Sequence, residues 1–290
     1  MTRVSPAKVN LHLKILGGRP DGFHEIETLM VPVTLADEIH INVVDEPGIV
    51  LRCENPQVPT GAENLIGRAA ELFFEETGTS LGLHIHLLKK IPMGAGLGGG
   101  SSNAATVLVA LNDLAGSRLS VADLENLAAR IGSDVAWFIR GEAAICRGRG
   151  EIIGGKVEVP CWPLLLLKPP FGVSTPWAYQ AWAKLLNQES ITQVVDGIPL
   201  NNDLEPPVFH KYVLLPAIKS WLLAQDGVRA GAMSGSGSTM FAVLESAALA
   251  DSLSREARAV FGETLWVHRC EISPSPPPDL PDGGDSGFFR

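Results

Sequence analysis

A glycine-rich segment in the first half of the chain holds the residues best suited to chemistry. Residues 92–105 read Pro-Met-Gly-Ala-Gly-Leu-Gly-Gly-Gly-Ser-Ser-Asn-Ala-Ala, so five glycines fall within seven positions. Because glycine has no Cβ, its backbone can approach a ligand closely and can adopt positive φ. The N–H groups of such a loop can converge on phosphate oxygens. The segment therefore predicts a phosphate-binding loop, and the alternative is a flexible surface loop.

The residues that follow this segment favour the phosphate-binding alternative. An alanine-rich stretch, residues 101–114, is expected to form a helix that starts directly after the last glycine. The free N–H groups and the dipole of a helix N-terminus add positive potential. Ser101, Ser102 and Asn103 lie in the expected first turn, where their side chains can cap the helix, contact phosphate or help to place Mg²⁺.

Two common phosphate-binding motifs do not fit these residues. The Walker A pattern ends in Gly-Lys-Ser/Thr, and no lysine follows Gly100. A dinucleotide-binding fingerprint can be aligned with Gly94, Gly96 and Gly99. That fingerprint lies in the first βα turn and needs an acidic residue at the end of the next strand. Asp113 instead falls at the end of the predicted helix, so we discount this motif.

The elements that must position the loop are a mixture of strands and helices. Apolar alternation predicts strands at residues 9–15, 39–44, 49–53, 83–88, 157–167, 240–244 and 267–272. The turn at 45–48 predicts that the second and third of these strands form a hairpin. Helical spacing predicts helices at 63–76, 101–114, 120–131, 177–186, 216–225 and 247–261. Ser120 with Asp123 resembles a capping box at the start of one helix.

The order of these elements predicts an α+β fold, because no regular βαβ alternation is present. We expect a first domain over residues 1–154 and a second over 155–272. The tail, residues 273–290, is rich in Pro, Gly, Ser and Asp. Such a segment buries too little apolar area to offset its chain entropy, so we expect it to be disordered.

Composition and charge disfavour several classes of protein. The formal net charge is −9 and no long Lys/Arg run is present, which disfavours a nucleic-acid partner. The four cysteines form no C-x-x-C pair, so we expect reduced core thiols rather than a zinc site or disulfides. The N-terminal residues show no signal peptide, and the apolar runs are too short to span a bilayer. We therefore expect a cytoplasmic protein with no membrane partner.

Three motifs in order resemble one kinase superfamily, the one that includes galactokinase, homoserine kinase, mevalonate kinase and phosphomevalonate kinase. Residues 6–11 resemble its first motif, 92–105 its central motif and 233–241 its third. Within it, the chain is most similar to the 4-diphosphocytidyl-2-C-methyl-D-erythritol kinase family. The resemblance covers residues 3–272. Further matching segments are 19–24, 63–66, 108–112, 132–135, 172–175 and 202–203.

The resemblance implies a two-domain α+β kinase with its active site in the cleft between the domains. Lys8 and Asp134 match the catalytic pair of the family. Asp134 would accept the proton of the attacking hydroxyl, and Lys8 would keep Asp134 ionised and stabilise charge on the transferring group. ATP and Mg²⁺ are the implied cofactors. The residues implied to bind ATP are Asn64, Pro92, Met93, Gly94, Ala95, Gly96, Leu97, Gly98, Gly99, Gly100, Ser101 and Ser102.

The resemblance also implies a binding site for a cytidine-diphosphate-linked substrate. Phe23 and His24 match the pair that holds cytosine, by ring stacking and by a hydrogen bond to the edge of the base. The family more often has tyrosine where this chain has Phe23, so a contact from that hydroxyl is missing. Another departure is Ala136, where proline often follows Asp-Val in the family. The full implied set is Asn10, Phe23, His24, Tyr179, Gly235 and Gly237.

The implied function is ATP-dependent phosphorylation of the 2-hydroxyl of 4-diphosphocytidyl-2-C-methyl-D-erythritol, in the non-mevalonate route to isoprenoid precursors. Two alternatives stay open from the sequence. One is another small-molecule kinase of the same superfamily, acting on mevalonate, homoserine or a sugar. The other is a nucleotide-binding protein without catalysis.

Overall fold

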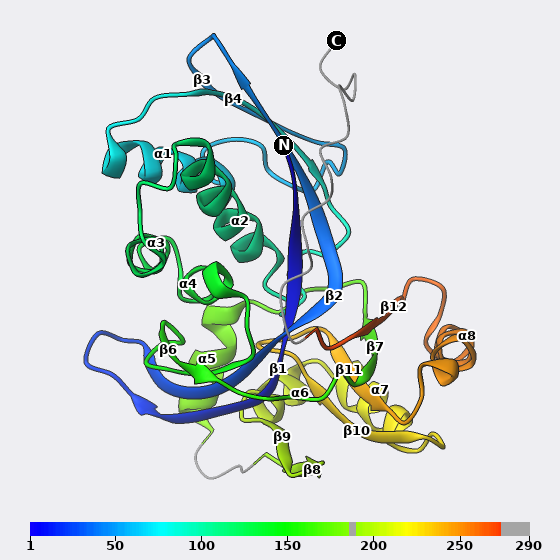
Figure 1. Cartoon of the computed structure of the whole chain (residues 1–290). Coiled ribbons are helices and arrows are strands. Elements are labelled where there is room, and N and C mark those ends of the chain that lie inside the picture. Colours follow the sequence, from blue (N-terminus) through cyan, green and yellow to red (C-terminus); the bar gives the residue numbers. More distant parts are fainter. Residues whose placement is uncertain (186–189, 274–290) are drawn as a thin grey trace.

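Two long antiparallel strands, β1 (Thr2–Gly18) and β2 (His24–Val44), run through the whole molecule (Figure 1). The computed structural model describes residues 1–185 and 190–273. The predicted strand 9–15 lies within β1, and its apolar residues Val9, Leu11, Leu13 and Ile15 are buried as the alternation predicts. The register between the two strands shifts just before Ala7 and again after Asn10. Such shifts bend a strand and redirect its side chains.

Within the described residues, eight strands form a first sheet. Its order is β3-β4-β2-β1-β9-β8, and β5 and β6 extend it from the side of β2. The bounds are β3 (Gly48–Cys53), β4 (Gly82–Leu88), β5 (Ala144–Arg147), β6 (Ile152–Lys156), β8 (Gln193–Val195) and β9 (Ile198–Asn202). Strand β9 pairs in parallel with β1 at His12 and Leu13. A segment from the second half of the chain therefore joins the sheet that the first half builds.

Four helices lie together on one side of the first sheet (Figure 1). They are α1 (Leu65–Thr77), α2 (Gly99–Leu114), α3 (Val121–Ala129) and α4 (Ser133–Arg140). Helix α2 is central. Its alanines, Leu108 and Leu111 are buried, and the helix packs against α1, α4 and β1, which explains its small side chains. The predicted capping box at Ser120 and Asp123 is confirmed, because Ser120 Oγ accepts from Asp123 N and the Asp123 carboxylate accepts from Ser120 N.

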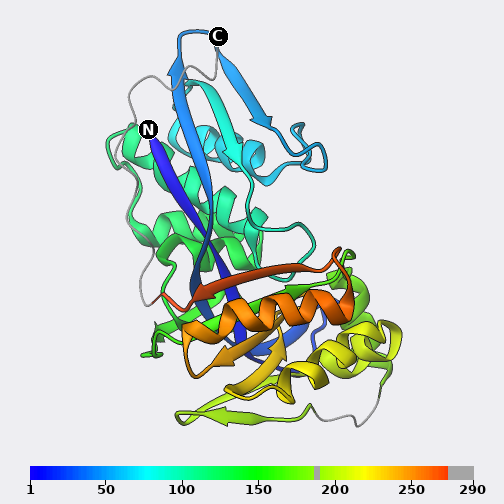
Figure 2. The ribbon, with the colours of Figure 1, turned by 90° about the vertical axis from the view of Figure 1, so that its right-hand side faces the viewer.

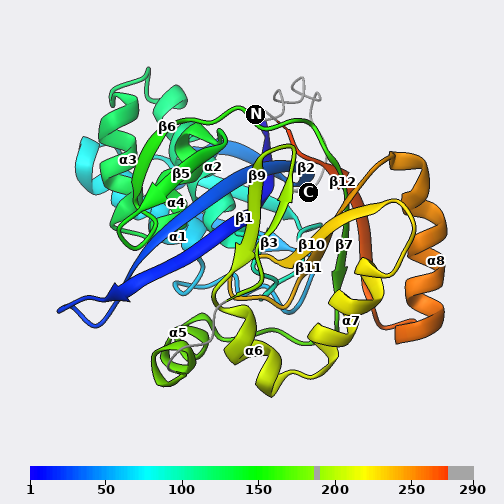
Figure 3. The same ribbon diagram turned by 90° about the horizontal axis from the view of Figure 1, so that it is seen from below.

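A second sheet of four antiparallel strands has the order β10-β11-β7-β12 within the described residues. The strands are β7 (Pro163–Lys168), β10 (Val228–Met233), β11 (Met240–Leu244) and β12 (Trp266–Glu271). The helices are α5 (Thr175–Lys184), α6 (Glu205–Lys211), α7 (Leu214–Leu223) and α8 (Ala250–Phe261), with a 3₁₀ turn at Ala247–Leu249. Figures 2 and 3 show α7 and α8 beside this sheet.

The run of leucines in β7 is explained by burial on both faces of the second sheet. Leu164 and Leu166 pack in one core with residues of β1 and β2. Leu165 and Leu167 pack in another core with residues of α7 and α8. A strand that is covered on both sides loses the alternation of a half-exposed strand and becomes continuously apolar.

One predicted pairing is wrong. Strands β2 and β3 do not form a hairpin, because β4 lies between them, antiparallel to β2 and parallel to β3. The start of β4 passes very close to the turn that joins β2 to β3. A Cβ on Gly82 would lie 2.0 Å from the carbonyl oxygen of Glu46. The glycine therefore permits an insertion that the turn sequence alone does not reveal.

Other element boundaries also differ from the prediction. The predicted strand 157–167 is a strand only from Pro163 onward, after Pro160 has interrupted the pattern. Helix α5 begins two residues before the predicted start, at Thr175, and the predicted end at residue 186 lies outside the described residues. Elements that the prediction missed are α4, α6, β5, β6, β8, β9 and β10.

The expected boundary near Gly154 and Gly155 lies inside β6, which pairs with β5. Strands β8 and β9 come from beyond that point, yet they belong to the first sheet, so the division at residue 154 stays a prediction. Of the predicted disordered tail, Ser273 donates to the carbonyl of Pro32, and residues 274–290 lie outside the described residues. No helix in the described ranges is long and apolar enough to cross a membrane.

Candidate active site

A cavity of about 720 Å³ opens where β1, the glycine-rich segment, α4, α5 and the turn between β10 and β11 meet. Every predicted site residue except Ser102 lies on its wall. These residues are Lys8, Asn10, Phe23, His24, Asn64, Pro92, Met93, Gly94, Ala95, Gly96, Leu97, Gly98, Gly99, Gly100, Ser101, Asp134, Tyr179, Gly235 and Gly237. The placement of Ser102 is a correction, because it is buried and its Oγ lies 2.8 Å from Ser5 Oγ.

The predicted catalytic pair meets at the centre of the cavity. Lys8 Nζ lies 3.6 Å from Asp134 Oδ2, and the lysine is only 3% exposed. The ammonium also donates to Gly96 O at 3.1 Å and to Asn10 Oδ1 at 2.5 Å. Asp134 lies in the first turn of α4, and its side chain is 37% exposed toward the cavity mouth. The lysine is therefore fixed from three sides, while the carboxylate can still reach a ligand.

Asn10 is oriented by a short chain of hydrogen bonds. Its Nδ2 donates to Thr28 Oγ1 at 2.8 Å, and Thr28 Oγ1 donates to His12 O at 2.6 Å. The amide oxygen of Asn10 is consequently the atom that faces Lys8. Thr28 also lies on the cavity wall. The sequence prediction missed it because β2, unlike β1, carries no recognised motif at that position.

The glycine-rich segment adopts the backbone that only glycine takes easily. The φ angles of Gly94, Gly96 and Gly98 are +59°, +73° and +71°, and α2 begins directly afterward at Gly99. A Cβ on Gly96 would lie 2.1 Å from the carbonyl oxygen of Ser234. The N-terminus of α2 therefore points into the cavity, as expected of an anion-binding helix start.

The turn at residues 234–238, which we call the second glycine loop, touches the first. Ser234 Oγ donates to Gly96 O at 2.9 Å and accepts from Asn10 N at 3.3 Å. Ser236 Oγ lies 2.8 Å from Thr175 Oγ1 at the start of α5. The second glycine loop thus joins the glycine-rich segment, β1 and α5 at one wall of the cavity.

A buried polar cluster supports the back of the glycine-rich segment. Asp37 is fully buried, and Lys90 N, Ile91 N and Asn103 Nδ2 donate to its carboxylate at 2.7, 2.8 and 2.9 Å. Lys89 pairs with the same carboxylate and also lies on the cavity wall. A buried carboxylate requires such compensation. The sequence prediction missed this cluster, because Asp37 lies in an ordinary strand pattern.

Asn64 caps helix α1 and also lines the cavity. It is the N-cap of α1, since its Oδ1 accepts from Ile66 N at 2.9 Å and its Nδ2 donates to Pro59 O at 2.6 Å. An asparagine at this position satisfies one of the free N–H groups of the helix. Both polar atoms are already engaged, so a ligand would meet the outer side of this capped turn.

The other end of the cavity is aromatic. The rings of His24 and Tyr179 are stacked with centroids 5.4 Å apart, and the ring of Trp182 stands edge-on to His24 at 5.5 Å. Phe23 is 53% exposed, and the Arg149 guanidinium lies 4.7 Å from its ring centroid. Burial raises the pKa of Tyr179, and the charge of Asp134 raises it further. The phenol therefore stays neutral and acts as a flat surface.

Burial keeps the thiol of Cys146, which feels the charges of Asp134 and Lys8, in its neutral form. Burial raises the pKa of Cys146 to about 12, and Asp134 raises it as well, against an opposing effect of Lys8. All four cysteines are free thiols. Cys146 and Cys270 are buried, whereas Cys161 is exposed and Cys53 is partly exposed, so the prediction of core thiols is wrong for Cys161. Among residues 1–185 and 190–273, no group of three or more His, Cys, Asp or Glu side chains is arranged to hold a metal ion.

The chain is similar to known proteins over most of its length. The family model for the GHMP kinases N terminal domain matches residues 64–142, and the model for the GHMP kinases C terminal domain matches 182–263. A 4-diphosphocytidyl-2-C-methyl-D-erythritol kinase of Methylacidiphilum infernorum (isolate V4) is 42% identical over 277 residues, which cover 92% of this chain and 95% of that protein.

Solved structures agree with the family models. A crystal structure of 4-(cytidine 5'-diphospho)-2C-methyl-D-erythritol kinase aligns with a TM-score of 0.78 at 36% identity, over 94% of this chain and 100% of that one. A homoserine kinase from Cytophaga hutchinsonii ATCC 33406 aligns with a TM-score of 0.65 at 18% identity, over 95% of both chains, which shows a shared fold alone. The predicted α+β kinase fold is confirmed.

Proposed function

This chain belongs to the 4-diphosphocytidyl-2-C-methyl-D-erythritol kinase family, and we propose that its cavity transfers the γ-phosphoryl group of ATP to the 2-hydroxyl of 4-diphosphocytidyl-2-C-methyl-D-erythritol. The observation that carries the proposal is the Lys8–Asp134 pair, 3.6 Å apart, between a glycine-rich anion site and an aromatic site. One end of the cavity suits phosphates and the other suits a base, with an acid–base pair between them.

In the proposed mechanism Asp134 accepts the proton of the substrate hydroxyl. The hydroxyl oxygen forms a bond to the γ-phosphorus, the bond from that phosphorus to the β,γ-bridging oxygen breaks, and ADP leaves with the electron pair. Lys8 stabilises the charge on the transferring group. Its ammonium is already fixed by Gly96 O and Asn10 Oδ1, so little reorganisation is needed when that charge develops.

We assign ATP to the end of the cavity formed by residues 92–101 and the N-terminus of α2. The positive φ angles at Gly94, Gly96 and Gly98 open the backbone toward the ligand. The helix N-terminus adds N–H donors, which compensates locally for the net negative charge of the chain. Lys89 also lies on this wall, with its charge offset by the Asp37 carboxylate.

The cytidine end of the substrate is assigned to Phe23, His24 and Tyr179. Aromatic rings can stack on a pyrimidine, and the His24 ring nitrogens can hydrogen-bond its edge. The stacked His24 and Tyr179 rings are adjacent to each other, and Phe23 lies exposed at the rim. Phe23 keeps the stacking surface of the tyrosine usual in the family and lacks its hydroxyl.

Mg²⁺ is expected with ATP, and the donor set of the cavity is compatible with it. Mg²⁺ is usually held by one or two carboxylates together with substrate phosphates and water. Besides Asp134, which is assigned as the base, the wall carries the Glu63 carboxylate and the Ser101 hydroxyl as candidate ligands. Ser102 is excluded from this role by its contact with Ser5. When bound, the ion would neutralise phosphate charge.

The location of the protein in the cytoplasm also stays a prediction.

A substrate panel tests the function. Purified protein is incubated with ATP, MgCl₂ and one acceptor at a time, and ADP release is measured for the cytidyl substrate, mevalonate, homoserine and galactose. We expect the cytidyl substrate to give the highest kcat/KM. Faster turnover of another acceptor would replace the substrate assignment. ATP binding without turnover of any acceptor would instead indicate a non-catalytic nucleotide-binding protein.

A further inference from the structure

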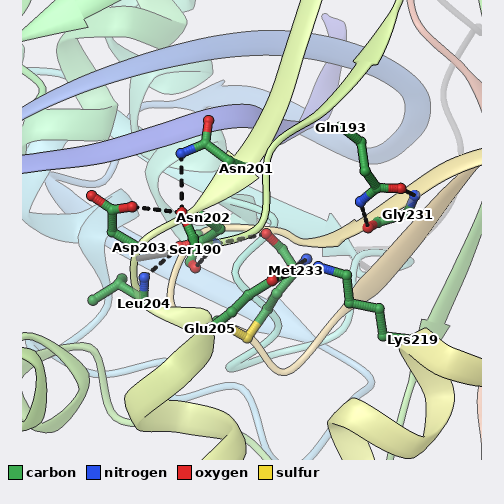
Figure 4. A network of polar contacts seen from close by, with 11 residues as sticks. Ser190, Gln193, Asn201, Asn202, Asp203, Leu204, Glu205, Lys219, Gly231 and Met233 are labelled. Carbon is green, nitrogen blue, oxygen red and sulfur yellow. Dashed lines mark hydrogen bonds and ion pairs between the residues drawn. The ribbon is translucent and has the colours of Figure 1, made fainter. Parts of the chain in front are cut away.

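Asn202 lies at the end of β9, directly behind the second glycine loop (Figure 4). The residue is fully buried, and its Nδ2 donates to both Met233 O and Gly235 O at 2.7 Å. Its Oδ1 accepts from Leu204 N at 2.9 Å. The whole amide is therefore used. Two of its three bonds hold carbonyl oxygens, one from Met233 at the end of β10 and one from Gly235 inside the second glycine loop.

These bonds decide which backbone groups of the second glycine loop face the cavity. A carbonyl oxygen directed at a phosphate would repel it, so an anion-binding loop must turn its carbonyls elsewhere. Asn202 holds one of them, Gly235 O, together with the carbonyl of Met233 directly before the loop. Among residues 1–185 and 190–273, the N–H groups of Gly235 and Ser236 have no hydrogen-bond partner, and both residues line the cavity. Gly235 has a φ of +54°, in the left-handed region that favours glycine.

The loop is also close to the reacting groups. A Cβ on Gly235 would lie 3.3 Å from Lys8 Nζ and 3.2 Å from Asn10 Oδ1. Asn202 itself is next to β1, because it pairs with Leu13 in the parallel ladder between β9 and β1. The same residue is thus attached to the strand that carries Lys8 and to the loop opposite it.

A buried ion pair holds the start of the loop from the other side (Figure 4). Glu205 Oε1 accepts from Met233 N at 2.8 Å, and Glu205 Oε2 is 2.5 Å from Lys219 Nζ on α7. Met233 is therefore fixed by Glu205 at its N–H and by Asn202 at its carbonyl. The loop has little freedom to turn while both contacts persist.

We propose that Asn202 is a positioning residue for phosphoryl transfer: its amide holds Gly235 O away from the cavity and fixes Met233 O just before the loop, so that the loop offers its N–H groups to phosphate oxygens beside Lys8. The inference rests on the proposed function. The phosphate is either the transferring γ-phosphoryl group or the diphosphate of the acceptor. Both groups would accept hydrogen bonds from the loop in the same way. The effects of the variants on kcat and on KM distinguish between them.

The test compares Asn202→Asp with Asn201→Asp. The first variant keeps the shape of the side chain and replaces the shared donor by an oxygen that repels both carbonyls. The control residue is the neighbour in the same strand and is 6% exposed, and its amide contacts His12 and Ser190 rather than the loop. Asn202→Ala, which removes the donor without adding charge, is measured as well. It provides the same comparison if Asn202→Asp does not fold.

We expect kcat/KM for the cytidyl substrate to fall by about 10-fold or more in both Asn202 variants, less than the effect of removing a donor that touches the reacting group itself. Asn201→Asp should stay within about twofold of wild type. A fall in kcat alone indicates contact with the transferring group. A rise in KM for the cytidyl substrate alone indicates contact with its diphosphate. Wild-type kinetics in the Asn202 variants, or an equal loss in the control, would overturn the proposal.

Two further measurements separate positioning from loss of fold and from failure of the proposed function. The Kd of ADP, measured by calorimetry on protein that circular dichroism shows to be folded, should be unchanged in the Asn202 variants. If the affinity for ADP fell by the same factor as kcat/KM, the variants would have lost the structure of the whole site, and the proposal would be overturned. If wild-type protein turns over another acceptor instead, the substrate assignment fails, and the same variants are compared with that acceptor.

Discussion

The Lys8 ammonium on β1 and the Asp134 carboxylate in the first turn of α4 face each other 3.6 Å apart. The lysine is held by Asn10 and Gly96, whereas Asp134 is partly exposed. The side of the pair that can move toward a substrate is therefore the carboxylate. This asymmetry suits a rigid cation that stabilises charge and an accessible base that takes a proton.

Replacing Asp134 by asparagine should lower kcat by a factor of about 10² or more, the usual scale for a positioned base. The amide keeps the size of the side chain and cannot accept the hydroxyl proton. The Kd of ATP, measured by calorimetry, should change little. Asp251→Asn is a suitable control, because that residue is 63% exposed and pairs with Arg269 on the surface. Full activity of Asp134→Asn would remove the proposed base.

Gly96→Ala should impair both stability and activity. A Cβ would lie 2.1 Å from Ser234 O at a φ of +73°, so the two glycine loops must separate. We expect the free energy of unfolding in urea to fall by about 1–3 kcal/mol. Gly67→Ala in α1 meets no atom within 4 Å and should instead add up to about 1 kcal/mol. Equal stability of the two variants would contradict the close contact of the loops.

Tyr179→Ala should raise KM for the cytidyl substrate by about 10-fold, because stacking on one base is worth about 1–3 kcal/mol. The KM for ATP should not change, since Tyr179 belongs to the residues that are assigned to the cytidine and not to those assigned to ATP. The other tyrosine of the chain, Tyr212, stacks on Phe171 and does not line the cavity, which makes Tyr212→Ala the matched control. If Tyr179→Ala raised KM for ATP and left KM for the cytidyl substrate unchanged, the ATP and cytidine ends of the cavity would have to be exchanged.

Glu205→Gln and Lys219→Met should each destabilise the protein by about 3 kcal/mol, because each leaves a buried partner without its charge. The double variant should recover part of this loss, as measured by the free energy of unfolding in urea. The exposed pair Asp251 and Arg269 provides the comparison, and removing it should cost less than about 1 kcal/mol. Strictly additive losses at Glu205 and Lys219 would argue against a coupled pair.

Much of the site could be predicted from the sequence, because its parts are short motifs. The glycine-rich segment, Lys8 and Asp134 are each recognisable locally. Their mutual distance could not be predicted, since it depends on how β1 and α4 pack. Ser102 shows the limit within one motif. Successive helical residues point about 100° apart, so Ser101 faces the cavity and Ser102 turns toward Ser5.

The fold was predictable to a similar degree. Alternation located most strands, but partner choice is a tertiary property, and the insertion of β4 between β2 and β3 left no local signal except Gly82. Thr28, Asp37 and Lys89 were missed for the same reason. Each is an ordinary residue in its own strand or connection, and it gains its role only from a neighbour far away in the chain.

The parallel pairing of β9 with β1 has a consequence for synthesis on the ribosome. When residue 154 has emerged, the edge of β1 at His12 and Leu13 still lacks its neighbour, which is made only when residue 202 is added. An open strand edge is a template for unwanted pairing. In the nascent first half, the edge of β1 therefore stays exposed until β9 has been synthesised. When β9 pairs with β1, it also places Asn202 behind the second glycine loop.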